Sequence, residues 1–310
     1  MLFFVTNVAQ HLTMDFKRLL YVAGPTASGK TVLAIALAKY FDTEIISCDS
    51  RQFYKEMTLG TAVPTPEELS DAPHHFIQQR SIHKPYSIGD FQREALKTLK
   101  TLFKTKDTVI LVGGSGMYAD ALISGLDVFP KVDSQIRIDL SAKLQNEGIE
   151  ALSGQLKKLD PDYYQKVDLS NPHRLIRALE VCLASGLPYS SFLGNKKAPD
   201  FFITKKILIQ WERQKLYQRI NQRVDQMIAA GLEKEVKTLY LSKNENALQT
   251  LGYREWFLYL DRTIDRTTLI EEIKKNTRRY AKRQTTWFKR YSDAILVDGG
   301  TSLDDVLGRL

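Results

Sequence analysis

A glycine-bracketed loop near the N-terminus carries the residues with the clearest capacity for chemistry. It matches the pattern G-x-x-x-x-G-K-[ST] and stands between a short apolar run and a segment of helical periodicity. Backbone N–H groups of such a loop point at phosphate oxygens, and the following helix adds the positive end of its dipole. The loop, called the phosphate loop below, comprises Gly24, Pro25, Thr26, Ala27, Ser28, Gly29, Lys30 and Thr31. It predicts a protein that binds a phosphorylated substrate.

The last two residues of the phosphate loop supply what its backbone lacks. Lys30 brings a mobile positive charge to the terminal phosphates, and Thr31 offers a hydroxyl to Mg²⁺. We therefore predict Mg²⁺ as the cofactor. The reaction stays open at this point, because kinases, NTPases and other phosphate-handling enzymes share the motif.

Two further segments are predicted to meet the loop. Asp49 ends an apolar run and is suited to three roles: metal ligand, general base or helix cap. Ser115 lies in a glycine turn that ends another apolar run. In a doubly wound sheet the ligand lies beyond the carboxyl ends of the strands. We therefore expect 26–31, 49–52 and 113–118 to converge on one cleft.

The elements that must position these residues alternate between strands and helices. Apolar runs predict strands at 18–24, 43–49, 107–113, 205–211 and 294–299, and helical periodicity predicts helices at 31–40, 87–104, 214–241 with a break at Gly231, and 267–291. The fold class is α/β, a P-loop parallel sheet core with an inserted all-helical domain. The predicted core covers 17–126 and 205–310, the insertion covers 127–204, and 1–16 form an N-terminal extension.

Composition narrows the class of protein. With 43% hydrophobic residues, the 310-residue chain is neither disordered nor fibrous, and its net charge of +8 favours a polyanionic partner. Cys48 and Cys182 have no disulfide or metal-site spacing, and no apolar run reaches the length of a membrane span. We predict a cytoplasmic protein that does not associate with membranes. The adjacent His74 and His75 are not predicted to bind metal, because their side chains point apart.

The helix predicted at 267–291 is strongly basic and interleaved with aromatic residues. Either it is a solvated face, or it contacts an RNA backbone, which the neighbouring phosphate loop favours. Its basic residues are Lys274, Lys275, Arg278, Arg279, Lys282, Arg283, Lys289 and Arg290.

Taken together, the motifs resemble the tRNA dimethylallyltransferase family from Lys17 to Tyr291. They are "GPTASGKT", "ISCDSRQFYKEMTLGTAVPTPEEL", "APHH", "YSIGDFQREA", "LVGGSGMY", "NPHRLIRALEV", "LQTLGYREW" and "RRYAKRQTTWFKR". The resemblance implies Mg²⁺-dependent transfer of a dimethylallyl group from dimethylallyl diphosphate to N6 of adenosine 37 of tRNA, with release of diphosphate. It implies the anticodon stem-loop of tRNA as partner, and nothing in the sequence requires more than a monomer.

The resemblance also implies roles for individual residues. Asp49 matches the base that takes a proton from the adenine amine, and Ser115 stands where the family usually has threonine. The phosphate loop would hold the diphosphate together with Arg219 and Arg223. The residues implied to contact tRNA are Asp49, Ser50, Arg51, Gln52, Ser115, Arg137, His173, Arg174, Leu175, Ile176, Arg177, Gln249, Thr250, Leu251, Gly252, Tyr253 and Arg254, and also Lys282 and Arg283 of the basic helix.

Three other functions stay open at this stage. An adenylate isopentenyltransferase would share the loop, Asp49 and the glycine turn, but it has less need of a helical insertion and a basic helix. A small-molecule P-loop kinase would turn over ATP without a prenyl donor. A non-catalytic, GTPase-like RNA-binding module would need base-specific nucleotide motifs, which we do not find.

Overall fold

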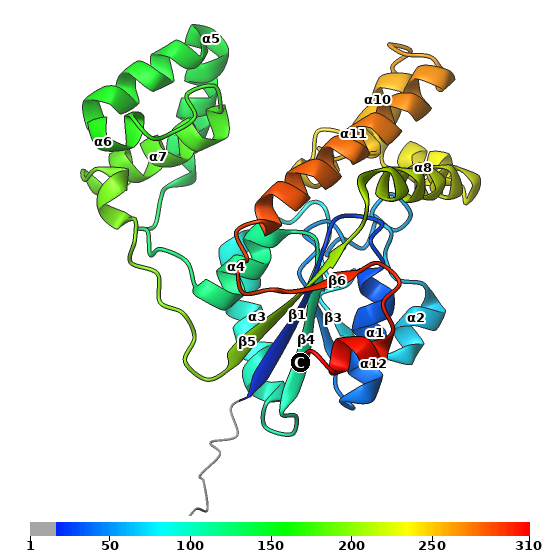
Figure 1. The fold of residues 1–310 in the computed structure, drawn as a ribbon. Coiled ribbons are helices and arrows are strands. Elements are labelled where there is room, and N and C mark those ends of the chain that lie inside the picture. The colour runs from blue at the N-terminus through cyan, green and yellow to red at the C-terminus, as the bar shows by residue number, and fades with distance from the viewer. Residues whose placement is uncertain (1–16) are drawn as a thin grey trace, which may run out of the picture. The chain divides into compact units, whose positions relative to one another are not determined.

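The computed structural model describes residues 17–310, so the predicted extension at 1–16 lies outside the described residues. Six parallel strands form one sheet in the order β3-β2-β4-β1-β5-β6 (Figure 1). They are β1 (Arg18–Ala23), β2 (Ile45–Ser47), β3 (His74–His75), β4 (Thr108–Gly113), β5 (Ile203–Gln210) and β6 (Ile295–Asp298). The predicted α/β class with a parallel sheet is confirmed. The two-residue strand β3 has no counterpart among the predicted elements.

The strand register brings the predicted functional segments to one edge of the sheet. Ala23 of β1 pairs with Gly113 of β4, and Ser47 of β2 pairs with Val112 of β4. The strands therefore end level with one another. Because β1 lies between β4 and β5 in the sheet, the phosphate loop lies between the turn after β4 and the connection from β5 to α8.

Helices cover both faces of the sheet. Along β1, Leu19 and Tyr21 pack into one core while Leu20 and Val22 pack into the other, since side chains of a strand alternate between its two faces. One face carries α1 (Lys30–Tyr40), α2 (Pro66–Asp71) and α12 (Leu303–Leu307), and the other carries α3 (Ile88–Leu102) and α4 (Gly116–Ser124) (Figure 1). The Ser87 side chain caps α3 by accepting from the Asp90 backbone N–H.

A group of helices stands over the carboxyl edge of the sheet (Figure 1). It comprises α8 (Arg213–Ala229), α9 (Leu232–Thr238), η2 (Tyr240–Ser242), η3 (Asn246–Leu248), α10 (Tyr253–Leu260) and α11 (Arg266–Phe288). The break predicted at Gly231 is confirmed: its φ of +99° lies in the left-handed region, which favours glycine. Leu248, Trp256 and Ile273 are buried between these helices.

The described chain divides into two compact units, 17–123 with 199–310 and a helical unit at 124–198. The helical unit contains α5 (Ser134–Leu159), α6 (Pro161–Tyr164), α7 (Pro172–Ser185) and η1 (Tyr189–Phe192), with a core of its own. Gly148, at φ +81°, divides α5 into two helical segments. The predicted insertion ran to 204, but Ile203 already pairs with Arg18 in β5, so that boundary was too late. No helix described at 17–310 is long and apolar enough to cross a membrane.

Candidate active site

The backbone of the phosphate loop includes a conformation that favours glycine. Gly29, at the start of α1, has φ +93°, a left-handed conformation that is strained for other residues. The Lys30 ammonium donates to the Pro25 carbonyl over 2.7 Å and so lies across the mouth of the loop. Burial and the positive Arg223 lower the pKa of Lys30 to about 8. A bound anion would offset both effects.

Two side chains hold the phosphate loop from outside. The Trp211 indole N–H donates to the Ser28 carbonyl over 3.0 Å, and Arg219 Nε donates to the Ala27 carbonyl over 2.8 Å. The Arg219 guanidinium also lies 4.5 Å from the centre of the Trp211 ring. Arg219 thus supports the loop backbone through Nε, and its predicted contact with the diphosphate stays a prediction. Arg223, one helical turn later, lines the two cavities beside the loop that are described below.

Gln284 of α11 joins the loop to the turn after β4. Its side-chain oxygen accepts from the Thr26 N–H over 2.8 Å, and its side-chain nitrogen donates to the Gly114 carbonyl over 2.9 Å. Sequence reasoning missed this residue. A signal was present, because Gln284 occupies a position between Ala281 and Phe288 on the buried side of α11, where an amide needs partners.

We expect Gln284→Ala to lower the free energy of unfolding by about 2 kcal/mol, because two backbone groups lose a buried partner. Affinity for inorganic pyrophosphate should fall as well, since the loop loses a support. Urea unfolding and calorimetry measure the two effects. Gln284→Glu keeps an acceptor for Thr26 but places a carboxylate against the Gly114 carbonyl and beside the anion, so its loss of pyrophosphate affinity should be at least as large. If Gln284→Ala binds pyrophosphate as tightly as the wild type does, Gln284 does not support the phosphate loop.

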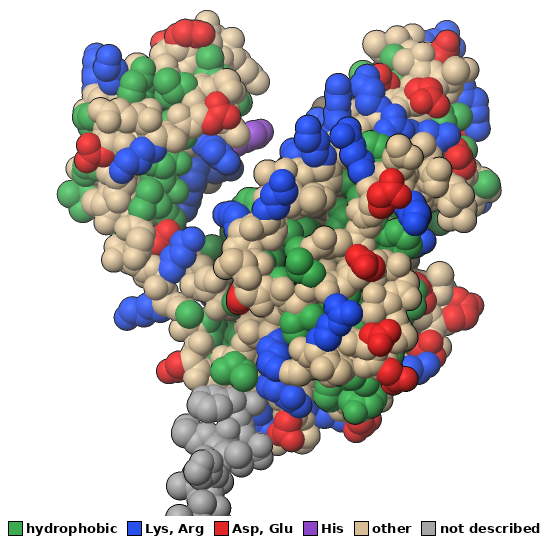
Figure 2. Space-filling model, viewed as in Figure 1, with side chains coloured by type: hydrophobic (Ala, Val, Ile, Leu, Met, Phe, Trp, Pro, Cys, Tyr) green, Lys and Arg blue, Asp and Glu red, His purple; other side chains and the backbone are tan. Residues whose placement is uncertain are grey.

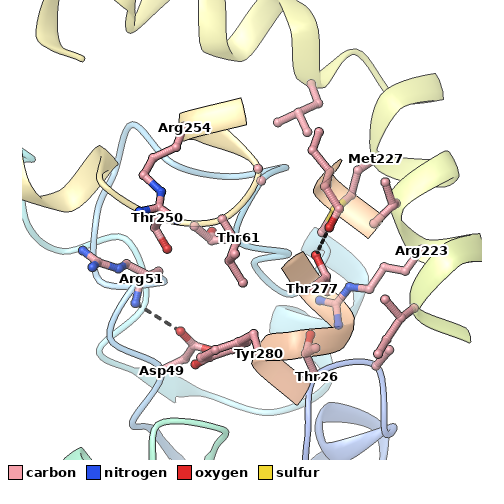
Figure 3. A pocket seen from close by; sticks show the side chains of 18 of the residues that line it. Thr26, Asp49, Arg51, Thr61, Arg223, Met227, Thr250, Arg254, Thr277 and Tyr280 are labelled. Atoms are coloured by element: carbon pink, nitrogen blue, oxygen red, sulfur yellow. Dashed lines mark hydrogen bonds between the residues drawn. The ribbon is translucent and has the colours of Figure 1, made fainter. Parts of the chain in front are cut away.

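Asp49 and Ser115 lie beside the loop at the ends of β2 and β4. The Arg51 N–H donates to Asp49 Oδ1 over 3.1 Å, and the Ser50 N–H donates to the Ser115 hydroxyl over 3.3 Å. The ring of Tyr280 lies next to Asp49 (Figure 3). Burial and the Asp49 charge raise the pKa of Tyr280 to about 12, so the phenol is protonated at neutral pH. Tyr280 is one of the aromatic residues of the predicted basic helix, and no pattern in the sequence assigns it a role in the site.

The residues that follow Asp49 connect the site to its surroundings. The Arg51 guanidinium donates to the Asn246 and Ala247 carbonyls over 3.2 and 3.1 Å. Gln52 donates to the Ala62 carbonyl over 2.8 Å. The 49–52 segment therefore forms one rim of the site.

The central feature is a cavity of about 340 Å³, the large cavity, with two unlike walls. Its apolar wall comprises Ile220, Val224, Met227, Leu232 and Ile273, and its polar wall comprises Asp49, Ser50, Arg51, Thr250 and Arg254. Figure 3 shows Met227 and Arg223 facing Arg51, Thr250 and Arg254 across the space. The arrangement suits a ligand that combines an apolar group with polar groups.

A small cavity of about 70 Å³ adjoins the large one beside the phosphate loop. Both cavities are lined by Thr26, Asp49, Thr61, Arg223 and Tyr280. A molecule with phosphates at the loop can therefore extend past Tyr280 into the large cavity.

The side chains that line the small cavity include oxygen ligands of the kind that the predicted Mg²⁺ requires. The hydroxyls of Thr31 and Ser47 and the Asp49 carboxylate line it, and these are the oxygen ligands that Mg²⁺ prefers. His74 Nδ1 lies 2.8 Å from the Ala72 carbonyl, which leaves Nε2, buried and without a partner in the described part of the chain, as an acceptor. No group of three or more His, Cys, Asp or Glu side chains within 17–310 could hold a metal alone. The donor set fits Mg²⁺ that is shared with phosphate oxygens.

Glu235 of α9 organises the rim of the large cavity. Its carboxylate accepts from the N–H groups of Thr58, Leu59 and Gly60 over 2.7–3.2 Å and from the Tyr253 hydroxyl over 2.6 Å. Tyr253 is fully buried, so the predicted direct contact with tRNA is corrected: it anchors the segment. Its predicted companions Gln249, Thr250, Leu251, Gly252 and Arg254 do line the cavity.

The basic residues of α11 divide into two sets. Lys274 pairs with Asp225 at 2.8 Å, and Arg278 donates to Asn221 over 2.7 Å, so both face α8. Arg279, Lys282 and Arg283 are exposed, and Arg283 lines the large cavity, with its guanidinium 5.7 Å from the Tyr280 ring centre. Figure 2 shows Lys and Arg side chains gathered over α11. Only the exposed set is available to a polyanion.

In the helical unit, the predicted tRNA-binding residues of α7 face in different directions. His173 and Arg174 are exposed at the start of the helix, whereas Leu175 and Ile176 are buried in the core of the unit. The predicted RNA contacts of Leu175 and Ile176 are therefore corrected.

Two arginines of the helical unit surround a buried carboxylate. Arg137 forms two hydrogen bonds with Glu180, and Arg177 approaches the same carboxylate at 3.5 Å. Arg177 also lies 5.0 Å from the ring centre of Phe129. Both arginines remain partly exposed, which leaves guanidinium surface for a further partner.

Comparison with known proteins decides the family. A family model described as IPP transferase matches residues 52–291. The chain is 51% identical to the tRNA dimethylallyltransferase of Flavobacterium johnsoniae, and the match covers 94% of this chain and 96% of that one. It is 53% identical to the tRNA dimethylallyltransferase of Christiangramia forsetii, covering 88% and 90% of the two chains. The chain belongs to the IPP transferase family.

Solved structures of the IPP transferase family share the fold. The tRNA isopentenylpyrophosphate transferase of Bacillus halodurans superposes with a TM-score of 0.70 at 35% identity over 94% of each chain. A eukaryotic dimethylallyltransferase described as acting on tRNA superposes with a TM-score of 0.79 at 27% identity, covering 93% of this chain and 75% of that one. The family resemblance stated from the sequence motifs is confirmed.

Proposed function

We propose that this chain is a tRNA dimethylallyltransferase, which transfers the dimethylallyl group of dimethylallyl diphosphate to N6 of adenosine 37 of tRNA and releases diphosphate. One observation carries the proposal. The small cavity beside the phosphate loop shares Asp49 and four other lining residues with the large cavity, which has an apolar and a polar wall. The apolar wall suits the prenyl group, and the polar wall suits an adenine base. The names of the relatives support the same activity.

The reaction breaks the C1–O bond of the donor and forms a bond from C1 to N6 of the adenine. The electron pair of the broken bond leaves with diphosphate, where the loop N–H groups, Lys30 and Arg223 stabilise the growing negative charge. The N6 proton passes to the Asp49 carboxylate, because the amine becomes acidic as its bond to C1 forms. Ser115 positions the acceptor through its hydroxyl.

Mg²⁺ is the proposed metal, which the Thr31 hydroxyl would hold together with the donor's phosphate oxygens. When bound, it neutralises charge on the leaving diphosphate. Tyr280 lines both cavities, and we propose that its ring limits the access of water to the allylic carbon when the donor is bound.

The proposed partner is the anticodon stem-loop of tRNA. Lys282 and Arg283 would contact its backbone, and the 49–52 and 249–254 segments would surround the base, which must leave its stack to reach Asp49. His173, Arg174, Arg137 and Arg177 of the helical unit are proposed to contact the same RNA. The monomeric state and the cytoplasmic location remain predictions from the sequence.

A direct assay tests the function. The protein is incubated with Mg²⁺, radiolabelled dimethylallyl diphosphate and either unmodified tRNA or AMP. We expect label in tRNA only, as N6-isopentenyladenosine at position 37. Label in AMP alone would indicate an adenylate isopentenyltransferase, and ATP turnover without prenyl transfer would indicate a kinase.

We expect the double variant Lys282→Ala, Arg283→Ala to bind tRNA more weakly, with a salt dependence shallower by about one unit of log Kd against log salt for each lost phosphate contact. Donor affinity should stay unchanged, because Lys282 and Arg283 do not line the small cavity. Filter binding at several salt concentrations measures this effect. Lys97→Ala with Lys104→Ala, two exposed lysines on and after α3, is the matched control. If both double variants weaken tRNA binding equally, the effect comes from the net charge of the protein and not from a contact of Lys282 and Arg283.

A further inference from the structure

We infer that Met227 of α8 sets the length of the prenyl chain that the enzyme accepts, limiting the donor to five carbons. The inference rests on the proposed function and adds a specificity-determining residue to it. It starts from the apolar wall of the large cavity, three members of which come from a single helix.

The apolar wall begins at the phosphate loop. Ile220, Val224 and Met227 follow one another at intervals of four and three residues, so they share one face of α8. Ile220 is fully buried and packs in one cluster with Ala27 of the phosphate loop. Arg223, on an adjacent position of this face, lines both cavities. A prenyl chain attached to a diphosphate in the loop therefore runs along α8 from Arg223 toward Met227.

The available length along α8 is short. Arg223 and Met227 are four residues apart, which corresponds to about 6 Å along the helix axis. This suits an extended dimethylallyl group. A ten-carbon geranyl chain would need a second turn of the same length, where the Met227 side chain stands (Figure 3).

Nothing beyond Met227 extends the apolar wall along this helix. The helix ends at Ala229, and the chain reverses at Gly231 in the left-handed region. Leu232, the next residue, is 1% exposed and belongs to the main core, so it is a fixed stop. Met227 is only partly buried and is unbranched, which makes it the adjustable member of the wall.

The opposite wall cannot take the additional carbons. Arg51 and Arg254 face Met227 across the cavity (Figure 3). An apolar chain laid against these guanidinium groups would remove their water without offering hydrogen bonds, which is unfavourable. The longer chain is therefore restricted to the α8 side, where Met227 blocks it.

The test compares dimethylallyl and geranyl diphosphate as donors to unmodified tRNA. The wild type should use dimethylallyl diphosphate and discriminate strongly against geranyl diphosphate. In Met227→Ala, we expect the ratio of kcat/KM for geranyl over dimethylallyl diphosphate to rise about 10-fold or more, the usual effect of added room in an apolar pocket. In Met227→Trp, which shortens the pocket, KM for dimethylallyl diphosphate should rise. Leu241→Ala, at a side chain of η2 that is 99% exposed, is the matched control and should leave the ratio unchanged.

The outcomes separate the inference from the proposed function. If the wild type transfers no prenyl group to tRNA, the proposed function fails. If it transfers dimethylallyl but Met227→Ala, folded and active, keeps the wild-type donor ratio, the role of Met227 is overturned. A wild type that already uses both donors equally would overturn it too.

Discussion

Asp49→Asn should lower the rate of prenyl transfer to tRNA by about 10²–10⁴-fold, the usual contribution of a positioned general base. The amide oxygen of asparagine can still accept from the Arg51 N–H, which Asp49 accepts at 3.1 Å, so the local turn should survive. Single-turnover kinetics with saturating donor and tRNA measures the chemical step. Binding of tRNA and thermal unfolding should both match the wild type.

The matched control for this substitution is Asp200→Asn, which removes an exposed carboxylate before β5. It should leave transfer unchanged. Loss of folding in Asp49→Asn would show that the carboxylate is structural. Near-wild-type transfer in a folded Asp49→Asn protein would require another group to take the N6 proton.

Lys30→Met should lower kcat/KM for dimethylallyl diphosphate by about 10²–10³-fold, since a preorganised positive charge at the leaving group is lost. The protein should remain folded, because Lys30 is a partly buried cation whose ammonium forms one hydrogen bond, to the Pro25 carbonyl. Lys39→Met removes an exposed lysine from the same helix, where it forms a surface ion pair with Asp71, and should have little effect. An unchanged donor affinity in Lys30→Met would contradict the predicted role.

The pH dependence of donor affinity is a second test of Lys30, in which the wild type is compared with Lys30→Met. Burial and Arg223 lower this pKa to about 8 in the free protein, so Lys30 is positively charged below pH 8 and becomes neutral above it. Donor affinity should therefore fall as the pH rises through 8, whereas affinity of Lys30→Met should not follow this transition. Titration of donor Kd between pH 7 and pH 9.5, with tRNA absent, separates binding from the acid–base role of Asp49. If the affinity of the wild type for the donor does not change between pH 7 and pH 9.5, Lys30 does not titrate in this range.

The parallel sheet and the phosphate loop were predictable because their signals are local. The strands β1 and β4 are buried on both faces, so they read as continuous apolar runs in the sequence. The loop shape follows from two glycines between a strand and a helix, and the break at Gly231 follows from glycine's tolerance of positive φ. Once parallel strands are assumed, the meeting of Asp49 and Ser115 beside the loop follows from where the strands end.

The partners of individual side chains were decided by the tertiary structure. Gln284 lies 258 residues from Thr26 in the chain, yet it holds the phosphate loop, and Arg219 supports the same loop through the Ala27 carbonyl. Similarly, Tyr253 is buried because Glu235 of another helix accepts its hydroxyl. Periodicity along the chain specifies which face of an element is apolar. The packing of elements distant in sequence determines which polar group meets a given backbone atom, and only the folded chain determines that packing.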